Sequence, residues 1–527
     1  MSTTSDHGTA VTTTEEVPDV AHDERATTPR TGSGVFRAFW RWHFYASAIV
    51  IPIMLLLSVT GLVMLFKWRL DPLTQPGVLT VSVPQHGGAA TPSAQEAAVM
   101  ALHPDATVTG VQFGGDDRTT FFTVDLPGGE TRNVYVNPWT GQVTGELDPR
   151  HLLSNIATEI HGHIVFGSVS DPELFTDPVT KQPFTVGSFG DRIIEFATCW
   201  AIVMTLTGYS LYFRGRVSAR RRVERAATAT DRRTATTRRR HGSVGAIIGV
   251  GILLLTLSGL PWTGMWGAKV QAWATGTNFS LWGDDPGATS TLAKTVEAAG
   301  SSSVPAPWAE GAAPMPSSMP GMNHGSATPA GGVVGRISLD AVVSAAQSDG
   351  LQGPYYVAYP SEEDGVFSVL ADMWHDEATP AYSDVSRERV VHVDQYSGVV
   401  AGRYSYAEYP TAAKVVSQGI ALHEGQRFGT LNFVGSALFC LAMIYLCITG
   451  PVMWWRRRPH GALAAPRGRM PLKARPWLLL AAVLLGVFLP MFGASLVLVL
   501  LFDHVVVSRS PRLTAVFSRV SPRDGKA

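Results

Sequence analysis

Cysteine, charge and nucleotide-binding motifs are scarce in this sequence of 527 residues, and each scarcity excludes a class of protein. The three cysteines, Cys199, Cys440 and Cys447, form no Cys-x-x-Cys or Cys-x-x-Cys-His motif, which excludes a redox-active dithiol and covalently attached haem. No G-x-G-x-x-G follows a strand and no P-loop occurs, which excludes a built-in nicotinamide, flavin or ATP site. Charged residues make up only 16 % against 45 % hydrophobic residues, too apolar a balance for an ordinary soluble protein.

Long apolar runs account for this balance. They cover residues 44–66, 193–213, 243–266, 430–455 and 477–502, and each is about as long as a helix that crosses ~30 Å of hydrocarbon. All three cysteines fall inside these runs, so the segments between them carry no disulfide. The sequence therefore predicts a multi-pass α-helical membrane protein with about five transmembrane helices.

The distribution of arginine predicts the orientation. The formal net charge is zero, which gives no reason to expect a nucleic-acid partner. Eleven arginines lie in 214–240, and a second basic segment covers 456–476; short basic loops beside spans are expected in the cytoplasm. This places the amino terminus inside, 67–192 and 267–429 outside, and the carboxyl terminus outside after five crossings. The five basic residues of the tail 503–527 disagree with that last placement.

The halves of the chain repeat each other, which predicts an internal duplication. In the first and third spans a histidine stands seventeen residues before a Thr-Gly or Ser-Gly pair: His43 before Thr60, and His241 before Ser258. The second and fourth spans carry Thr207-Gly208 and Thr449-Gly450 at matching places. Before these two spans the figure His-x4-Phe-Gly occurs twice, beginning at His161 and His423.

The outer segments repeat as well. "NVYVNPWTGQVTG" (133–145) matches "VVHVDQYSGVVAG" (390–402), each an alternating strand, a glycine turn and a second strand. Upstream, "TPSAQEAAVMAL" and "SLDAVVSAAQ" predict short helices capped by Thr or Ser. Two small extracytoplasmic α+β modules are predicted.

The predicted boundaries follow from these patterns. They are 1–35, a disordered cytoplasmic tail without an apolar signal core; 36–66, the first span; 67–150, the first outer module; 151–213, an outer histidine segment and the second span; 214–240, a cytoplasmic loop; 241–266, the third span; 267–410, the second outer module with a loop at 301–333; 411–455, the second histidine segment and fourth span; 456–476, a cytoplasmic loop; 477–502, the fifth span; and 503–527, a tail.

The four repeated histidines lie in two layers, one near each face of the membrane. His43 and His241 form the predicted inner layer, and His161 and His423 the outer layer. Imidazole near the hydrocarbon boundary needs a partner and is a common axial ligand of haem iron, so each layer is a candidate haem site. The alternative is that each histidine is merely interfacial. His163 competes with His161, but its repeat position holds Gly425.

The fixed order of these elements, twice over, resembles the PepSY-associated transmembrane proteins across about 36–460. Their members include inner-membrane ferric-siderophore reductases with two b-type haems on histidine ligands. The resemblance implies PepSY-like outer modules, two haems on the four repeated histidines, and electron transfer across the plasma membrane to a ferric chelate. The electron donor would be a separate reductase or quinol, because the chain has no nucleotide site.

Two other functions are considered. A non-catalytic module that binds or regulates a partner protein at the outer face is the alternative, by similarity to domains attached to secreted peptidases. Metal transport is disfavoured, because the spans lack deep acidic residues.

Two minor sites remain. Thioether and imidazole groups suit Cu(I), which makes a cluster in the Pro- and Gly-rich outer loop a candidate copper site against the alternative of a plain disordered loop. The cluster comprises Met315, Met319, Met322 and His324. Aromatic residues of the outer modules that could recognise a chelate are Trp139, Trp374 and Tyr396, and the alternative for Trp374 is a strand end that packs on the membrane surface.

Overall fold

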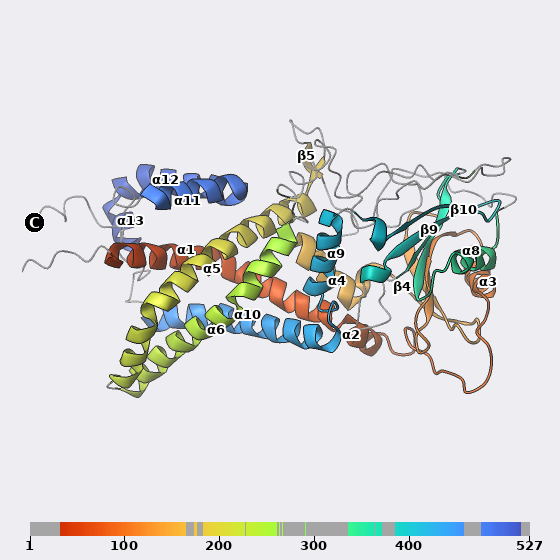
Figure 1. The fold of residues 1–527 in the computed structure, drawn as a ribbon, viewed down its shortest axis with the longest axis horizontal. Coiled ribbons are helices and arrows are strands. Elements are labelled where there is room, and N and C mark those ends of the chain that lie inside the picture. The colour runs from red at the N-terminus through yellow and green to blue at the C-terminus, as the bar shows by residue number, and fades with distance from the viewer. Residues whose placement is uncertain are drawn as a thin grey trace, which may run out of the picture.

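The computed structural model describes residues 32–164, 173–176, 183–226, 228–260, 263, 266, 290, 336–362, 364–371, 385–409, 411–457 and 476–517. In these residues five helices are long and apolar enough to cross a membrane: Val35–Leu65, Phe189–Val217, Ala229–Gly259, Gly429–Arg456 and Pro490–Arg509. The chain is therefore a multi-pass helical membrane protein. Figure 1 shows the long helices at one end of the molecule and a β-sheet at the other.

Four helices form the central bundle: α1 (Gly32–Leu65), α5 (Val186–Glu224), α6 (Ala229–Gly259) and α10 (Gly429–Arg457). Helices α1 and α6 each contact both α5 and α10. Two short helices, α4 (Leu153–His163) and α9 (Thr411–His423), lie between the bundle and the sheet and lead into α5 and α10 (Figure 1). The short helix α2 (Lys67–Thr74) follows α1 directly.

The arginine-rich segment 214–240 is mostly helical, although the sequence analysis predicted a loop. Helix α5 continues to Glu224, and α6 begins at Ala229 with Thr228 as its cap, whose hydroxyl accepts a hydrogen bond from the Asp231 amide. Arginine and alanine both have high helix propensity, so the helices of the apolar spans continue into the basic segment. Only a short turn separates the two helices.

The outer strands form a single antiparallel sheet of eight strands. They are β1 (Thr107–Gln112), β2 (Thr120–Asp125), β3 (Thr131–Val136), β4 (Val143–Leu147), β7 (Tyr355–Ala358), β8 (Val366–Ala371), β9 (Arg389–Asp394) and β10 (Val400–Ser405). Their order across the sheet is β10-β9-β8-β7-β1-β2-β3-β4. A separate hairpin of β5 (Glu173–Thr176) and β6 (Pro183–Thr185) precedes α5.

The two predicted outer modules are therefore joined, not separate. Strand β1 pairs with β7 as well as with β2, and Gly110 stands opposite Ala358 in this seam. Apart from each other, β1 and β7 would each present a row of unpaired backbone groups, and pairing satisfies both rows. Tyr356 crosses over Gly110 at the seam: a Cβ atom on Gly110 would lie 1.8 Å from the Tyr356 hydroxyl.

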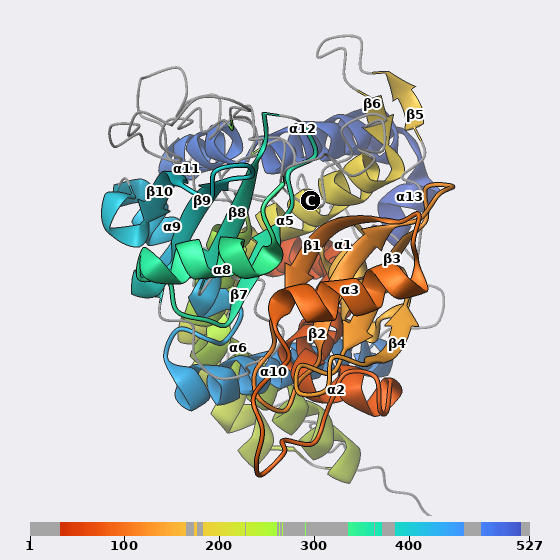
Figure 2. The ribbon, with the colours of Figure 1, turned by 90° about the vertical axis from the view of Figure 1, so that its right-hand side faces the viewer.

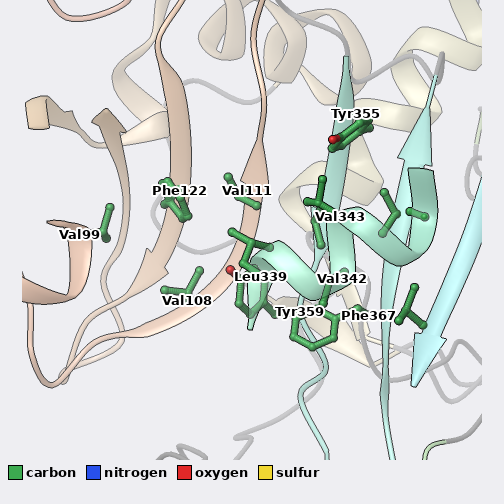
Figure 3. Close-up of a cluster of buried hydrophobic side chains, with 14 of the residues drawn as sticks. Val99, Val108, Val111, Phe122, Leu339, Val342, Val343, Tyr355, Tyr359 and Phe367 are labelled. Atoms are coloured by element: carbon green, nitrogen blue, oxygen red, sulfur yellow. The ribbon is translucent and has the colours of Figure 1, made fainter. Parts of the chain in front are cut away.

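One face of the sheet is covered by α3 (Pro92–Leu102) and α8 (Leu339–Ser348), as Figure 2 shows. Thr91 and Ser338 cap them, which confirms the predicted helix starts. The core beneath combines side chains from both halves, such as Phe122 and Phe367, each at most 1 % exposed (Figure 3). The helices also bond to each other, because the Ser93 amide donates to an Asp340 carboxylate oxygen at 2.9 Å.

Both predicted strand-turn-strand units are confirmed. Gly141 between β3 and β4 and Gly398 between β9 and β10 have the same φ of 69°. That left-handed conformation costs glycine little, and it closes each tight turn. Single-turn 3₁₀ helices flank the sheet strands and the last helices: η1 (Pro149–His151), η4 (Val385–Arg387), η5 (Tyr406–Glu408) and η6 (Val507–Arg509).

The predicted fifth span, 477–502, is divided into α11 (Pro476–Phe488) and α12 (Pro490–Val505), which fold back on each other. Pro490 is the first residue of α12, where proline's missing N–H is tolerated. Close packing needs glycine at two positions: a Cβ on Gly493 would lie 2.5 Å from the carbonyl oxygen of Gly486. The pair packs on α5, where Trp200 Nε1 donates to Ser495 Oγ at 3.0 Å.

The end of the described chain returns to the start of the bundle. After α13 (Pro511–Val516), the carbonyl oxygen of Phe517 accepts a hydrogen bond of 2.8 Å from the Tyr45 hydroxyl on α1. Both described ends lie at the same end of the bundle (Figure 1), which disagrees with the prediction that five crossings place the two termini on opposite sides. Among the described residues of the tail, the basic Arg509 and Arg512, which disagreed with an outside placement, fit this arrangement.

Candidate functional site

The predicted inner histidines lie in two helices of the bundle, His43 on α1 and His241 on α6. They are near enough for the charge of one to influence the other. His43 Nδ1 is 3.0 Å from the carbonyl oxygen of Met204 and 3.3 Å from Thr207 Oγ1, both on α5. His241 Nδ1 is 2.8 Å from Thr449 Oγ1 on α10. A neighbouring helix thus fixes each imidazole of this inner pair.

The predicted outer histidines also meet. His161 lies in the last turn of α4 and His423 in the last turn of α9, with ring centroids 6.4 Å apart and ring planes at 88°. His161 Nδ1 is 2.9 Å from Thr60 Oγ1 on α1. His423 Nδ1 is 3.1 Å from Ser258 Oγ on α6. This outer pair is held in the same manner as the inner pair.

Every hydroxyl that contacts a repeated histidine belongs to one of the Thr-Gly or Ser-Gly pairs found in the sequence. At two pairs the glycine makes room for the imidazole. A Cβ atom on Gly61 would lie 3.4 Å from His161 Cε1, and one on Gly208 would lie 3.2 Å from His43 Cε1. Gly450 instead faces Ile51 on α1. The small residues therefore serve side-chain placement as well as helix packing.

The histidine–hydroxyl hydrogen bonds lie within one half of the chain, whereas the histidine pairs lie between the two halves. Each histidine–hydroxyl bond stays within one half of the chain, because it joins α1 to α4 or α5, or α6 to α9 or α10. Each histidine pair joins the two halves, because one member comes from either half. The outer pair thus forms a contact between the halves, and the inner pair brings one imidazole from each half to a second level of the bundle.

The geometry of the outer pair fits a shared metal ion. Two imidazoles that bind one ion through Nε2, with metal–nitrogen bonds of ~2 Å, have ring centroids about 6 Å apart. Hydrogen bonds of the four histidines use Nδ1, and in the described part of the chain none uses Nε2. No group of three or more His, Cys, Asp or Glu there could hold a bare ion. Haem iron, which needs only axial protein ligands, fits two facing imidazoles.

Three further histidines lie apart from the pairs: His163, which competes with His161 in the sequence, and His151 and His504, which no repeat supports. The side chain of His163 is 53 % exposed and is 4.0 Å from an Asp191 oxygen, away from the outer pair. His151 is 81 % exposed beside Asp148. His504 is exposed near the end of α12. The structure thus brings together the four histidines that the repeat selected and leaves these three apart.

Two further predicted residues, Trp139 and Tyr396, lie in turns of the sheet. Trp139 lies in the β3–β4 turn, where its Nε1 donates to the Asp116 carbonyl oxygen at 3.0 Å, and Tyr396 lies in the β9–β10 turn. Trp374 and the candidate copper ligands fall outside the described residues. These ligands are Met315, Met319, Met322 and His324.

Two kinds of residue near the site were not predicted from the sequence. The Thr-Gly and Ser-Gly pairs served only as marks of the repeat, although their matching spacing to the histidines was a signal that the hydroxyls act together with the imidazoles. Glu424, which directly follows His423, was also not predicted. Removal from water raises the pKa of the Glu424 carboxyl to about 7, while the charge of Lys67 opposes the shift. A carboxyl group with a raised pKa therefore directly follows one histidine of the outer pair in the sequence.

Comparison with known proteins identifies the family. No curated protein matches the chain. The family model of the PepSY-associated TM region matches residues 40–457, which include both histidine pairs and the whole sheet. The chain belongs to the PepSY-associated transmembrane family.

Proposed function

We propose that this protein is a membrane-embedded oxidoreductase that binds two b-type haems and carries electrons across the membrane to an extracytoplasmic ferric chelate such as a siderophore. The observation that carries the proposal is a pair of imidazoles at each of two levels of the bundle, each imidazole anchored through Nδ1, with the two outer rings 6.4 Å apart. A haem held by the histidines of each pair would supply one-electron chemistry at that level.

Each pair has a distinct task in this proposal. His43 and His241 bind the inner haem at the arginine-rich end of the bundle, and His161 and His423 bind the outer haem beneath the sheet. The outer pair is tied to the outer domain at both histidine helices. The Ser154 amide at the start of α4 donates to an Asp71 oxygen at 3.1 Å, and Gln418 of α9 donates to the Tyr406 hydroxyl at 2.9 Å.

The acceptor is a ferric chelate that approaches from the side of the sheet. Reduction to the ferrous state weakens binding by oxygen-donor chelators, so electron delivery would release the iron. The outer pair is the point of delivery, because α4 and α9 lie between the bundle and the sheet (Figure 1). Support for the substrate class comes from membership of the family and not from a recognised binding residue.

The donor is a separate reductase or quinol. A groove of about 570 Å³ between α6 and α10 favours a donor from the lipid phase. Arg239, Arg240 and Tyr445 line its polar part, and the exposed Ile247 lines its apolar part. The groove adjoins the inner pair, since the Tyr445 carbonyl oxygen accepts a hydrogen bond from Thr449, the residue that holds His241.

We also propose how the chain evolved and how it is oriented in the membrane. The chain arose by duplication of a unit of span, PepSY-like module and span, and it lies in the plasma membrane with its amino terminus in the cytoplasm. The matched contacts of the two halves support the duplication, since α1 and α6 each contribute one histidine and one hydroxyl to the paired layers. The arginines at the junction of α5 and α6 support the orientation.

An optical spectrum tests the function. The purified protein should be red and should show a b-type band that appears on reduction with dithionite, with about two haems for each chain. A lipid-reconstituted protein should pass electrons from an inner donor to a ferric chelate outside. A colourless protein that takes up no haem on reconstitution would contradict the proposal.

A second candidate is a non-catalytic module that binds a partner protein. The observation that favours it is the pair of outermost strands of the sheet, β4 and β10, each of which has one strand neighbour in the described residues. Such edges accept an added peptide strand. In that case alanine substitution of all four histidines would leave partner binding intact, whereas a proline in β10 would abolish it.

A further inference from the structure

We infer that Thr60, Thr207, Ser258 and Thr449 are positioning residues that hold the four imidazoles as the Nδ1–H tautomer and so leave each Nε2 lone pair for a metal. The inference rests on the proposed haem ligation and assigns a role to side chains that do not themselves touch the haem. The Thr-Gly and Ser-Gly pairs of the spans would then contribute to metal binding through their hydroxyl groups.

A hydroxyl group has one hydrogen, so it can donate only one hydrogen bond. In all four residues the hydroxyl lies within hydrogen-bonding distance of a backbone carbonyl in the preceding turn of its own helix. The oxygen–oxygen distances are 2.9 Å for Thr60, 2.9 Å for Thr207, 3.1 Å for Ser258 and 2.8 Å for Thr449. With the hydrogen directed there, the hydroxyl oxygen can only accept from the histidine, so Nδ1 is the protonated nitrogen.

His43 gives independent evidence for the same tautomer. Its Nδ1 is 3.0 Å from the carbonyl oxygen of Met204 as well as 3.3 Å from Thr207 Oγ1. A carbonyl oxygen has no hydrogen to donate, so Nδ1 must carry the hydrogen in this contact.

The tautomer matters because a neutral imidazole has one N–H and one lone pair. With the N–H at Nδ1, the lone pair is at Nε2, the nitrogen that makes no hydrogen bond in the described residues. An acceptor at Nδ1–H also fixes the orientation of the ring and makes Nε2 a stronger donor to the metal. Each hydroxyl lies in the same half of the chain as its histidine, so the ring is oriented before the two halves share a metal.

The two histidines of the inner pair differ in the number of hydrogen-bond acceptors at Nδ1. Thr449 Oγ1 is the acceptor for His241, whereas His43 has both Thr207 and the Met204 carbonyl. Loss of the hydroxyl at 449 therefore removes the support of His241, and loss of the hydroxyl at 207 leaves a backbone acceptor for His43.

The test uses variants of the full-length protein. Thr449→Val keeps the shape of the side chain and removes the acceptor. It should weaken binding of the inner haem by about 10- to 100-fold and raise the midpoint potential of that centre, since a less basic imidazole stabilises ferric iron less. Thr449→Ser should restore both values, and Thr207→Val should have a smaller effect. Thr256→Val is the control, because Thr256 bonds only to its own helix, at 2.7 Å from the Ile252 carbonyl oxygen.

Two results would overturn the inference. One is an unchanged affinity and potential in Thr449→Val, and the other is an equal change in Thr449→Val and Thr256→Val. A second readout needs no haem: nitrogen NMR of haem-free protein with labelled histidine should report Nδ1–H for the four imidazoles, and Nε2–H signals would contradict it. A wild-type protein that shows Nδ1–H but binds no haem would refute the proposed function and leave the tautomer assignment intact.

Discussion

At the scale of the residue, the four repeated histidines form an inner and an outer pair, and each imidazole contacts a hydroxyl on a neighbouring helix. Substitution of one histidine should therefore affect the haem of its own pair and leave the other haem in place. His423→Ala removes an imidazole of the outer pair and should reduce haem content by about half, with the inner centre still reducible, because one layer stays intact. His241→Ala should give the converse, an outer centre cut off from the inner donor. Haem content and reduction of an outer ferric chelate measure both effects.

His163→Ala is the matched control for the outer layer. It changes a histidine two residues from His161 whose side chain is 53 % exposed and lies beside Asp191. We expect normal haem content. Full haem in both His423→Ala and His241→Ala would refute the ligand assignment, and haem loss only in His163→Ala would move the outer ligand by two residues.

A second residue-scale prediction concerns His392 on β9, which is 3 % exposed and has its Nδ1 2.9 Å from Ser368 Oγ. Burial lowers the pKa of His392 from 6.5 to about 4. Between these values the unfolded chain binds a proton that the folded chain does not, so the free energy of unfolding falls as the pH falls. The full loss is about 3 kcal/mol.

The measurement is the thermal stability of wild-type protein and His392→Gln between pH 7 and pH 4. Only the difference between the two profiles is informative, because carboxyl groups titrate in both proteins. The wild type should lose more stability on acidification than the variant, while His86→Gln, an exposed substitution, should follow the wild type. Parallel profiles for wild type and His392→Gln would show that His392 is not the titrating group.

At the scale of the element, the seam between β1 and β7 determines whether the outer domain is one sheet or two. Gly110→Ala would place a Cβ atom 1.8 Å from the hydroxyl of Tyr356, a side chain that is only 9 % exposed. Overpacking of this kind costs about 1–3 kcal/mol, so the variant should unfold at lower temperature and expose the seam to protease.

Gly115→Ala is the control for that substitution, because no atom lies within 4 Å of the added Cβ. It should leave both stability and the protease pattern unchanged. If Gly110→Ala behaves like Gly115→Ala, the seam is not closely packed, and the two outer modules would have to be treated as independent units.

At the scale of the whole molecule, the two halves meet at the sheet seam and at the outer histidine pair, while the carboxyl-terminal helices lie against α1 and α5. This arrangement predicts that the tail faces the same side as the arginine-rich segment. In a cysteine-free background, Ser508→Cys should react with a membrane-impermeant thiol reagent together with Arg220→Cys, from the opposite side to Glu130→Cys. All three positions are exposed.

Joint labelling of Ser508→Cys and Glu130→Cys in intact cells would contradict the folded-back arrangement of α11 and α12. It would restore the single fifth crossing expected from the apolar run. Labelling of Arg220→Cys only after permeabilisation would in addition support the proposed cytoplasmic placement of the arginine-rich side.

Features that depend on local chemistry could be predicted from the amino-acid sequence alone. Long apolar runs identified the spans, because a helix satisfies its own backbone groups in hydrocarbon. Thr91 and Ser338 marked two helix starts, and Gly141 and Gly398 marked two turns, since caps and left-handed turns need particular residues nearby. The spacing of the repeat selected the four histidines, and the structure brings them together in pairs.

Contacts between residues that lie far apart in the chain could be identified only from the three-dimensional fold. The hydroxyl partner of each histidine depends on the rotation of one helix against another, and the β1–β7 seam depends on edges that lie far apart in the chain. The division of the last apolar run into two helices at Leu489–Pro490 was also not predicted, although Pro490 and the glycines at 486 and 493 are present in the sequence. An apolar run has the same composition whether it forms one long helix or two short packed ones, and contacts with α1 and α5 select between them.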